Sequence, residues 1–353
     1  MSRVTLVREA ETAWAPIHAG SMPAAPAAGL PELAVVRRSG LIESRHFGSL
    51  VALNASGQTV LALGDPDSVI LPRSTVKPLQ ALACLTAGAP LVGPEIAIAS
   101  GSHTGEDEHV RVVRGILQKA RLDESALGCP ADRPEDEATF EQMIRSGEAR
   151  SAIRMNCSGK HAAMLLTCAV NGWSTADYLD PAHPLQQHVA KTLAGATLVP
   201  IAHTALDGCG APLFATSVRG IATAFRALVQ ADAAEPAGHV AARMREFPFY
   251  VGGSGQANTE LMRALPGVLA KGGAEGVIGV AAADGSAVSM KIIDGSPRAT
   301  TLIALRVLEF LGAPVAGAEA LSEVAVLGGG RRVGEIVAGV DLLTAILTAE
   351  AAA

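Results

Sequence analysis

A proline near the start of an apolar run fixes where one helix can begin. In LPRSTVKPLQALACL, residues 71–85, Pro78 would clash with a carbonyl one turn back if it lay deep inside a helix. The helix must therefore begin only a few residues earlier, which puts Ser74 at or very near its N-terminus. Ser74 and Lys77 are three residues apart and share one helical face, so the amine could take the proton of the hydroxyl. A capping serine followed by a surface lysine would give the same pattern.

Short apolar runs at both ends of the chain predict strands. SLVALNASGQTVLALGD, residues 49–65, predicts a hairpin around a turn at 54–57. LAKGGAEGVIGVAAADGSAVSMKIIDG, residues 269–295, predicts two or three short strands, followed by a helix near 298–311. Since helices are expected between these strands, we predict an α+β fold, an α/β sandwich in which helices cover a mainly antiparallel sheet.

Three polar loops are expected between the two groups of strands. EIAIASGSHTGEDEHVRVVRGILQKARL, residues 95–122, predicts a strand, a loop that carries Ser102 and His103, and an amphipathic helix. Thr104 and Asp107 have capping-box spacing at the start of that helix. NCSGKHAAMLLTCAVNGW, residues 156–173, and the segment 207–230 each predict a polar loop that opens into a helix. Polar side chains therefore collect in loops, where an ordinary turn is the alternative to a functional site.

Composition excludes several classes of function. The net charge of −6 gives no broad cationic surface for nucleic acid, and glycine or proline interrupts each apolar stretch before it reaches membrane-spanning length. Five cysteines, an odd number, in a chain without a clear signal peptide favour reduced thiols and a cytoplasmic location. We expect residues 1–31 to be a flexible N-terminal extension and residues 32–353 to be a single catalytic region, with room for a helical subdomain.

Two further patterns carry possible chemistry. In penicillin-interacting enzymes, a Ser-x-x-Lys motif is followed on a later strand by Lys-Thr-Gly. Here Lys271 is followed by two glycines at the corresponding late position, without the threonine. Cys157 and Cys209 both lie in glycine-containing loops, with Lys160 three residues after the first, and could share a metal ion. Two cysteines alone, however, do not complete the usual tetrahedral zinc set.

Five segments together resemble the rhizobial inducible type of L-asparaginase, the asparaginase II family. They are RSTVKPLQ, SGSHTGEDEH, NCSGKHAAML, TALDGCGAP and AKGGAEGV, in family order over roughly residues 32–312. The resemblance implies a fold similar to serine β-lactamases and serine-dependent glutaminases. It also implies hydrolysis of L-asparagine to L-aspartate and ammonia by a homodimer, with no organic cofactor.

The resemblance also assigns roles to individual residues. It implies two Ser-Lys pairs, Ser74 with Lys77 and Ser102 with Lys271. The implied substrate-binding residues are Arg73, His103 and Asp207. The family's unusual zinc site, two cysteines and a lysine, falls on Cys157, Lys160 and Cys209. Because this metal has no evident role in activating water, we expect it to position substrate or stiffen loops.

Our hypothesis for the mechanism is an acyl-enzyme route. Ser74 attacks the side-chain amide carbon, Lys77 accepts the serine proton, and water later hydrolyses the ester. Ser102 and Lys271 would then relay protons or position water, and the reverse assignment of the two serines stays open. One alternative is a β-lactam or peptide hydrolase with the same Ser-x-x-Lys logic. Another is a non-catalytic, zinc-containing protein that binds amino acids.

Overall fold

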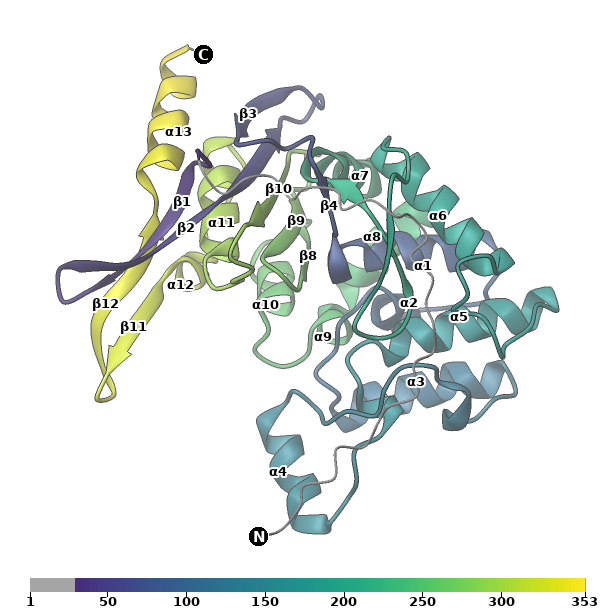
Figure 1. Ribbon diagram of the computed structural model, residues 1–353. Coiled ribbons are helices and arrows are strands. Elements are labelled where there is room, and N and C mark those ends of the chain that lie inside the picture. Colours follow the sequence, from purple (N-terminus) through teal and green to yellow (C-terminus); the bar gives the residue numbers. More distant parts are fainter. Residues whose placement is uncertain (1–28, 353) are drawn as a thin grey trace, which may run out of the picture.

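An antiparallel sheet forms one side of the molecule in the computed structural model, which describes residues 29–352 (Figure 1). Seven of its eight strands follow the order β11-β12-β1-β2-β10-β9-β8, and the eighth, β3, pairs with β2 outside this path. The strands are β1 (Glu32–Arg38), β2 (Leu41–Leu53), β3 (Thr59–Leu63), β8 (Leu269–Gly273), β9 (Val277–Ala281), β10 (Ala287–Ile292), β11 (Val324–Gly328) and β12 (Arg331–Ala338). The predicted antiparallel α+β architecture is therefore confirmed.

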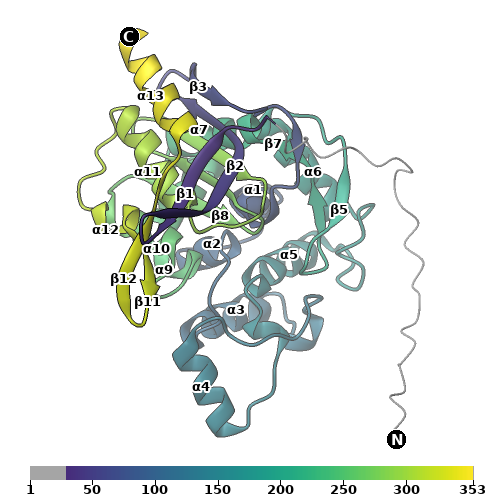
Figure 2. The same cartoon turned by 60° about the vertical axis from the view of Figure 1, so that its left-hand side comes forward.

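Helices cover both faces of the central strands. All five residues of β9 are buried, which requires that neither face of this strand meets solvent. Helix α7 (Val218–Gln230) packs on β2, β9 and β10, and a side chain at Gly279 would collide with its Ile221 and Phe225. Helix α11 (Thr300–Phe310) also packs on β9 and β10, while α13 (Val340–Ala352) lies against β1 and β3 (Figure 2).

The remaining helices gather beyond the β8 edge of the sheet (Figure 1). They are α1 (Lys77–Thr86), α2 (Pro94–Ala99), α3 (Asp107–Lys119), α4 (Glu137–Ser146), α5 (Ser158–Asn171), α6 (Pro184–Thr197), α8 (Pro236–Glu246), α9 (Pro248–Val251) and α10 (Ala257–Ala264). Short helix α12 (Glu319–Ser322) instead precedes β11. There are short 3-10 turns at η1 (Arg73–Val76), η2 (Glu124–Ala126) and η3 (Ala152–Arg154). Two small two-stranded sheets are formed by β4 (Val69–Ile70) with β7 (Thr216–Ser217) and by β5 (Thr204–Leu206) with β6 (Pro212–Phe214).

Several predicted elements occur where the sequence places them. The hairpin of β2 and β3 turns at residues 54–57, where the Gly57 N–H donates to the Asn54 carbonyl at 2.8 Å. The three late strands are β8, β9 and β10, and the predicted helix 298–311 is α11. The predicted helix after Cys157 is α5, but it begins earlier than expected, at Ser158, so Lys160 lies in its first turn and not in the loop. It ends at Asn171, and the φ of +65° at Gly172 suits a glycine that follows a helix.

Two local predictions are wrong. The predicted strand at 95–100 is helix α2, which begins at Pro94 and buries Ile96, Ala97, Ile98 and Ala99. A short apolar run buried on all sides has no periodicity that separates a strand from a helix. Thr104 and Asp107 do not form a capping box either: Glu106 is the N-cap of α3, and Thr104 donates to its carboxylate at 2.8 Å.

The ends of the chain add two observations. The last forty residues, which carry no recognised motif, supply β11, β12 and α13, and β12 pairs with β1 from Ala34 to Arg38. The predicted flexible extension, residues 1–31, lies almost wholly outside the described residues. Among residues 29–352 no helix combines the length and apolar composition that crossing a membrane requires.

Candidate functional site

Ser74 lies at a junction between two kinds of helix. It belongs to the 3-10 turn η1, and α1 begins at Lys77 with Pro78 in its first turn. The Ser74 carbonyl accepts the Lys77 backbone N–H, and the Ser74 side chain is half-buried. Arg73, immediately before it, has a φ of +51°, a strained value for a non-glycine residue. The turn therefore presents Ser74 from a backbone that surrounding contacts must hold in place.

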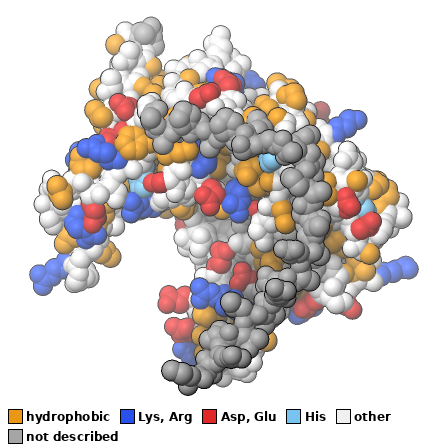
Figure 3. Space-filling view, viewed as in Figure 1, with side chains coloured by type: hydrophobic (Ala, Val, Ile, Leu, Met, Phe, Trp, Pro, Cys, Tyr) orange, Lys and Arg blue, Asp and Glu red, His pale blue; other side chains and the backbone are white. Residues whose placement is uncertain are grey.

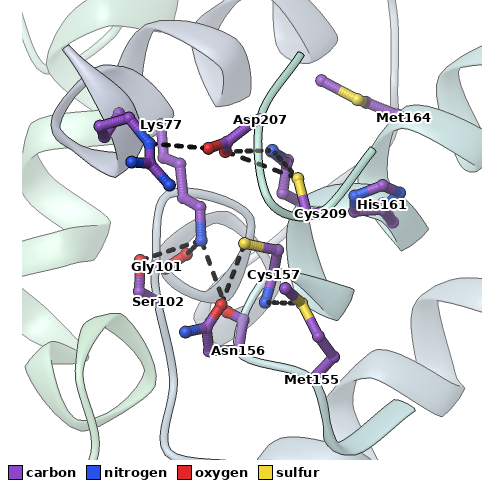
Figure 4. Close-up of polar contacts among 12 residues, drawn as sticks. Lys77, Gly101, Ser102, Met155, Asn156, Cys157, His161, Met164, Asp207 and Cys209 are labelled. Atoms are coloured by element: carbon purple, nitrogen blue, oxygen red, sulfur yellow. Dashed lines mark hydrogen bonds and ion pairs between the residues drawn. The ribbon is translucent and has the colours of Figure 1, made fainter. Parts of the chain in front are cut away.

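The Lys77 amine is buried and reaches across to another loop. It donates to the Gly101 carbonyl at 2.7 Å, to Ser102 Oγ at 2.9 Å and to the Asn156 carbonyl at 3.5 Å. Figure 4 shows Gly101, Ser102 and Asn156 together around this amine. Among the described contacts the Lys77 amine meets Ser102 rather than Ser74, so the structure links the two predicted Ser-Lys pairs to each other.

Lys271 brings a second buried amine to the same hydroxyl. Its Nζ lies 3.1 Å from Ser102 Oγ and donates to the Gly272 carbonyl at 2.5 Å. The side chain is fully buried, and this burial, together with the charge of Lys77, lowers the pKa of Lys271 to about 7. Ser102 therefore sits between two amines, of which Lys271 can lose its proton at neutral pH.

Strand β8 positions Lys271 because it lies directly against η1. A Cβ atom added to Gly273 would fall 2.6 Å from Thr75 Oγ1 and 2.9 Å from the Pro72 carbonyl, so only glycine permits this approach. The next peptide back is also held, since the Gly272 N–H donates to Asn258 Oδ1 at 2.7 Å. The two glycines after Lys271 thus join the sheet edge to the segment that carries Ser74.

His103 lies beside this site, but both of its ring nitrogens already have hydrogen-bond partners within the protein. It is fully buried, its Nδ1 accepts the Gly105 N–H at 3.1 Å, and its Nε2 lies 2.9 Å from Ser158 Oγ. Burial, and then the neighbouring His109 and Lys77, hold its pKa well below the usual value, so the ring is neutral. With Nδ1 accepting, Nε2 carries the proton and donates to Ser158. This arrangement holds the Ser102 loop against α5.

Arg73 and Asp207 form an ion pair on the other side of Ser74. Arg73 Nε donates to Asp207 Oδ1 at 2.9 Å, and the Arg73 guanidinium also lies 3.8 Å from Glu275 Oε1. Burial alone would raise the pKa of Asp207, but Lys160 and Arg73 lower it overall. Asp207 therefore stays ionised and fixes the guanidinium next to the strained turn.

Cys157, Lys160 and Cys209 lie close together next to Asp207, and Figure 4 shows Cys209 beside that carboxylate. Lys160 Nζ donates to Cys209 Sγ at 3.0 Å and lies 4.0 Å from Asp207 Oδ2. The neighbouring Cys157 thiol, followed by the Lys160 charge, lowers the pKa of Cys209 to about 5, despite burial. All three side chains are at most 3% exposed.

This donor set fits a soft divalent metal only if the lysine takes part. Thiolate sulfur and an amine nitrogen are suitable donors for Zn²⁺, and ordinary protein zinc sites use four ligands. In the described part of the chain, no group of three or more His, Cys, Asp and Glu side chains is arranged to hold a metal ion. The two sulfurs would therefore need Lys160, in its deprotonated form, to provide a third protein ligand.

Sequence reasoning missed three polar groups that shape the site. Asn156 receives the Lys77 amine on its carbonyl and the Cys157 thiol on its side chain at 3.0 Å. Asn258 holds the Gly272 peptide, and Glu135 accepts the Asn156 amide at 2.5 Å. Only Asn156, which precedes Cys157 in NCSGK, lies within a recognised motif; the other two come from segments without one.

Comparisons with known proteins agree with the motifs. The sequence model of the family described as L-asparaginase II matches residues 34–338, most of the chain. A comparison with curated proteins gives no significant match. Among solved structures, a β-lactamase from Desulfarculus baarsii DSM 2075 is 19% identical, with a TM-score of 0.35, over 76% of this chain and 93% of that one. A protein described as a β-lactamase, from Bacteroides dorei DSM 17855, is 12% identical, with a TM-score of 0.40, over 74% and 93%.

Proposed function

The chain belongs to the L-asparaginase II family, and from this premise we propose that it hydrolyses L-asparagine to L-aspartate and ammonia through a serine acyl-enzyme. The observation that carries the proposal is the Ser102 hydroxyl held between the buried amines of Lys77 and Lys271. Through the Ser102 hydroxyl, a proton can pass between the two amines without a water molecule. Amide hydrolysis needs two proton transfers of this kind: one from the attacking serine and one to the leaving ammonia.

In the proposed mechanism Ser74 is the nucleophile. Lys271, with a pKa lowered to about 7, can accept through Ser102 a proton that Lys77 gives up. The free Lys77 amine then takes the Ser74 proton as the serine attacks the amide carbon. No contact between these two side chains is among the described hydrogen bonds, so we expect it to form when substrate binds, as catalytic contacts often do.

The same relay serves the later steps. The proton on Lys77 passes through Ser102 to the leaving nitrogen, which departs as ammonia. A water molecule then attacks the ester, and the amines accept its proton. Arg73 is a suitable partner for the substrate carboxylate because its position is fixed by Asp207 and it is 25% exposed.

Ammonia release tests the proposal. The purified chain should release ammonia from L-asparagine, with L-glutamine and a reporter cephalosporin assayed in parallel. Ser74→Ala should abolish turnover, and Ser102→Ala should slow it by about 10²- to 10⁴-fold, the usual contribution of proton transfer by a side chain. Activity on the cephalosporin alone, or on no amide, would refute the asparaginase proposal.

Covalent trapping separates the roles of the two serines. In acid-quenched samples analysed by peptide mass spectrometry, the aspartyl ester should map to Ser74. It should accumulate in Ser102→Ala, where removal of the proton from the attacking water is impaired. An ester on Ser102, formed equally well by Ser74→Ala, would reverse the assignment.

We also propose that Cys157, Lys160 and Cys209 bind Zn²⁺, in line with the donor set and the family resemblance. Bound there, the ion would link the start of α5 to the connection between β5 and β6. It would thereby restrict the movement of Asp207, which orients Arg73. Elemental analysis of the dialysed protein should give about one zinc per chain in the wild type and much less in Cys157→Ser. Equal zinc content in both proteins would contradict this site.

The oligomeric state is a separate proposal. The family resemblance predicts a homodimer. Sedimentation of the full chain at several concentrations should give twice the chain mass of 35.9 kDa. A single species at the chain mass throughout would exclude a stable dimer.

A further inference from the structure

We propose that Glu135 binds the α-ammonium group of the substrate and thereby restricts the enzyme to free α-amino acid amides. This inference rests on the proposed asparaginase activity and identifies a recognition residue for it. No motif in the sequence marks Glu135, which lies in the connection between α3 and α4.

Two hydrogen bonds hold Glu135 beside the serine–lysine cluster, which is Ser102 with the amines of Lys77 and Lys271. Its backbone N–H donates at 2.8 Å to the carbonyl of Thr104, two residues after Ser102. Its carboxylate accepts the Asn156 side-chain amide at 2.5 Å, and the Asn156 carbonyl in turn receives the Lys77 amine. Ser102 and Asn156 lie side by side next to the Lys77 amine in Figure 4. Glu135 is thus tied to both segments that surround this amine.

The Glu135 carboxylate is also available to a ligand. The residue is exposed, and among the described residues its carboxylate is in no salt bridge. Other carboxylates near the site already have partners: Asp207 pairs with Arg73, and Glu275 lies 3.8 Å from the same guanidinium. The Glu106 carboxylate accepts the Thr104 hydroxyl and the N–H and hydroxyl of Ser254. The charge of Glu135 raises the pKa of Lys271 against the effect of burial, which places this carboxylate within electrostatic range of the amines.

Substrate chemistry requires such a group. L-asparagine carries both an α-carboxylate and an α-ammonium, and the site is lined by the Arg73 guanidinium and by the amines of Lys77 and Lys271, which hold at least one proton between them in the proposed mechanism. These cations attract the carboxylate and repel the ammonium. A substrate that lies with its amide at the serines therefore needs an anionic partner for its ammonium, and Glu135, bound to Asn156 beside the Lys77 amine, is a carboxylate with no cation partner among the described residues.

The test compares two substrates that differ only in the ammonium. L-asparagine and succinamic acid, which lacks the α-amino group, are assayed with the full chain and with Glu135→Gln. We expect the variant to raise the KM for L-asparagine by about 10- to 100-fold, as for loss of a charged hydrogen bond, with a smaller effect on kcat. The kcat/KM for succinamic acid should stay the same or rise.

Matched variants separate this role from others. Glu137→Gln removes the same charge two residues away, from an exposed side chain in the first turn of α4, and should behave as wild type on both substrates. Glu275→Gln tests the other carboxylate near Arg73. The inference is overturned if Glu135→Gln slows both substrates equally, if it affects neither, or if Glu275→Gln alone changes the ratio.

Binding measurements keep this inference distinct from the proposed reaction. If the wild type hydrolyses neither amide, the asparaginase proposal fails, and calorimetric titration with L-asparagine then decides the role of Glu135. Binding that is weakened in Glu135→Gln but not in Glu137→Gln would support ammonium recognition. Equal affinity in all three proteins would overturn it.

Discussion

Burial of a single amine sets the expected pH dependence. The pKa of Lys271 is lowered to about 7, mainly by burial and then by Lys77, and the proposed proton relay through Ser102 needs the unprotonated form of this amine. The kcat/KM should therefore fall as pH drops below about 7 and level off above it, as measured by ammonia release between pH 5 and 9. Lys271→Ala should lose most activity at every pH, while Lys191→Ala, a change at an exposed lysine, should keep the wild-type profile.

The same pKa has a consequence for stability with a defined sign. Between about pH 7 and the usual lysine pKa of about 10.4, the unfolded chain binds a proton at Lys271 that the folded chain does not. The contribution of this residue to the free energy of unfolding should therefore increase as pH rises through that window. Denaturant titrations at pH 7 and 9 should show a larger increase for the wild type than for Lys271→Ala. An identical increase in both proteins would contradict a buried, uncharged amine.

The sequence names the candidate side chains at this scale but not their partners. Ser74, Lys77, Ser102 and Lys271 all follow from motifs, yet the spacing pairs Lys77 with Ser74, whereas its amine contacts Ser102. A lysine side chain is long and its direction depends on acceptors supplied by the fold. Here those acceptors are carbonyls 24 and 79 residues further along the chain. Local spacing carries no information about them.

At the scale of elements, the approach of β8 to η1 depends on one missing side chain. Gly273→Ala would place a methyl group 2.6 Å from Thr75 Oγ1 and 2.9 Å from the Pro72 carbonyl. The Pro72 carbonyl is part of the backbone just before the Ser74 turn, so it cannot move away as a flexible side chain could, and the turn itself must shift. We expect kcat to fall by about 10²-fold, the loss that a misplacement of about 1 Å can cause.

Gly115→Ala is the matched control for this prediction. Gly115 lies inside α3 with open space where its Cβ would be, and alanine should stabilise that helix by up to about 1 kcal/mol. Activity should be unchanged in Gly115→Ala. Wild-type kcat in Gly273→Ala would mean that the contact between β8 and η1 does not position Ser74.

Elements differ in how well the sequence predicts them, for physical reasons. The hairpin of β2 and β3, the strands β8 to β10 and the helix α5 carry turn residues or capping glycines that act locally. Helix α2 is expected as a strand because its four consecutive buried residues, Ile96–Ala99, show neither the helical nor the strand periodicity. Strands β11 and β12 are an exposed hairpin, and their role depends on pairing with β1, almost 300 residues earlier in the chain.

At the scale of the whole molecule, the two ends of the described chain close on each other. The β12 strand pairs with β1, and α13 begins where the Asp341 carboxylate accepts the Glu32 N–H at 2.7 Å. In Figure 1 the β11–β12 arm projects from the sheet, and Figure 3 shows a notch between this arm and the lobe that holds α4. The site lies at the other end of the sheet, because β8 is four strands beyond β1, about 19 Å at the usual spacing.

This separation predicts that stability and activity can be changed independently. Leu342 is fully buried where α13 meets the sheet, so Leu342→Ala should lower the free energy of unfolding by about 2–5 kcal/mol. Leu347→Ala, on the same helix but 65% exposed, should change it by no more than about 0.5 kcal/mol. Both variants should keep the kcat/KM of the wild type at 25 °C, because α13 packs on β1, β3 and α11, whereas the candidate serines and lysines lie on η1, α1, β8 and the loop after α2. Denaturant unfolding and ammonia release measured on the same samples check both halves of the prediction. A large loss of kcat/KM in folded Leu342→Ala would mean that the sheet transmits strain from β1 to β8.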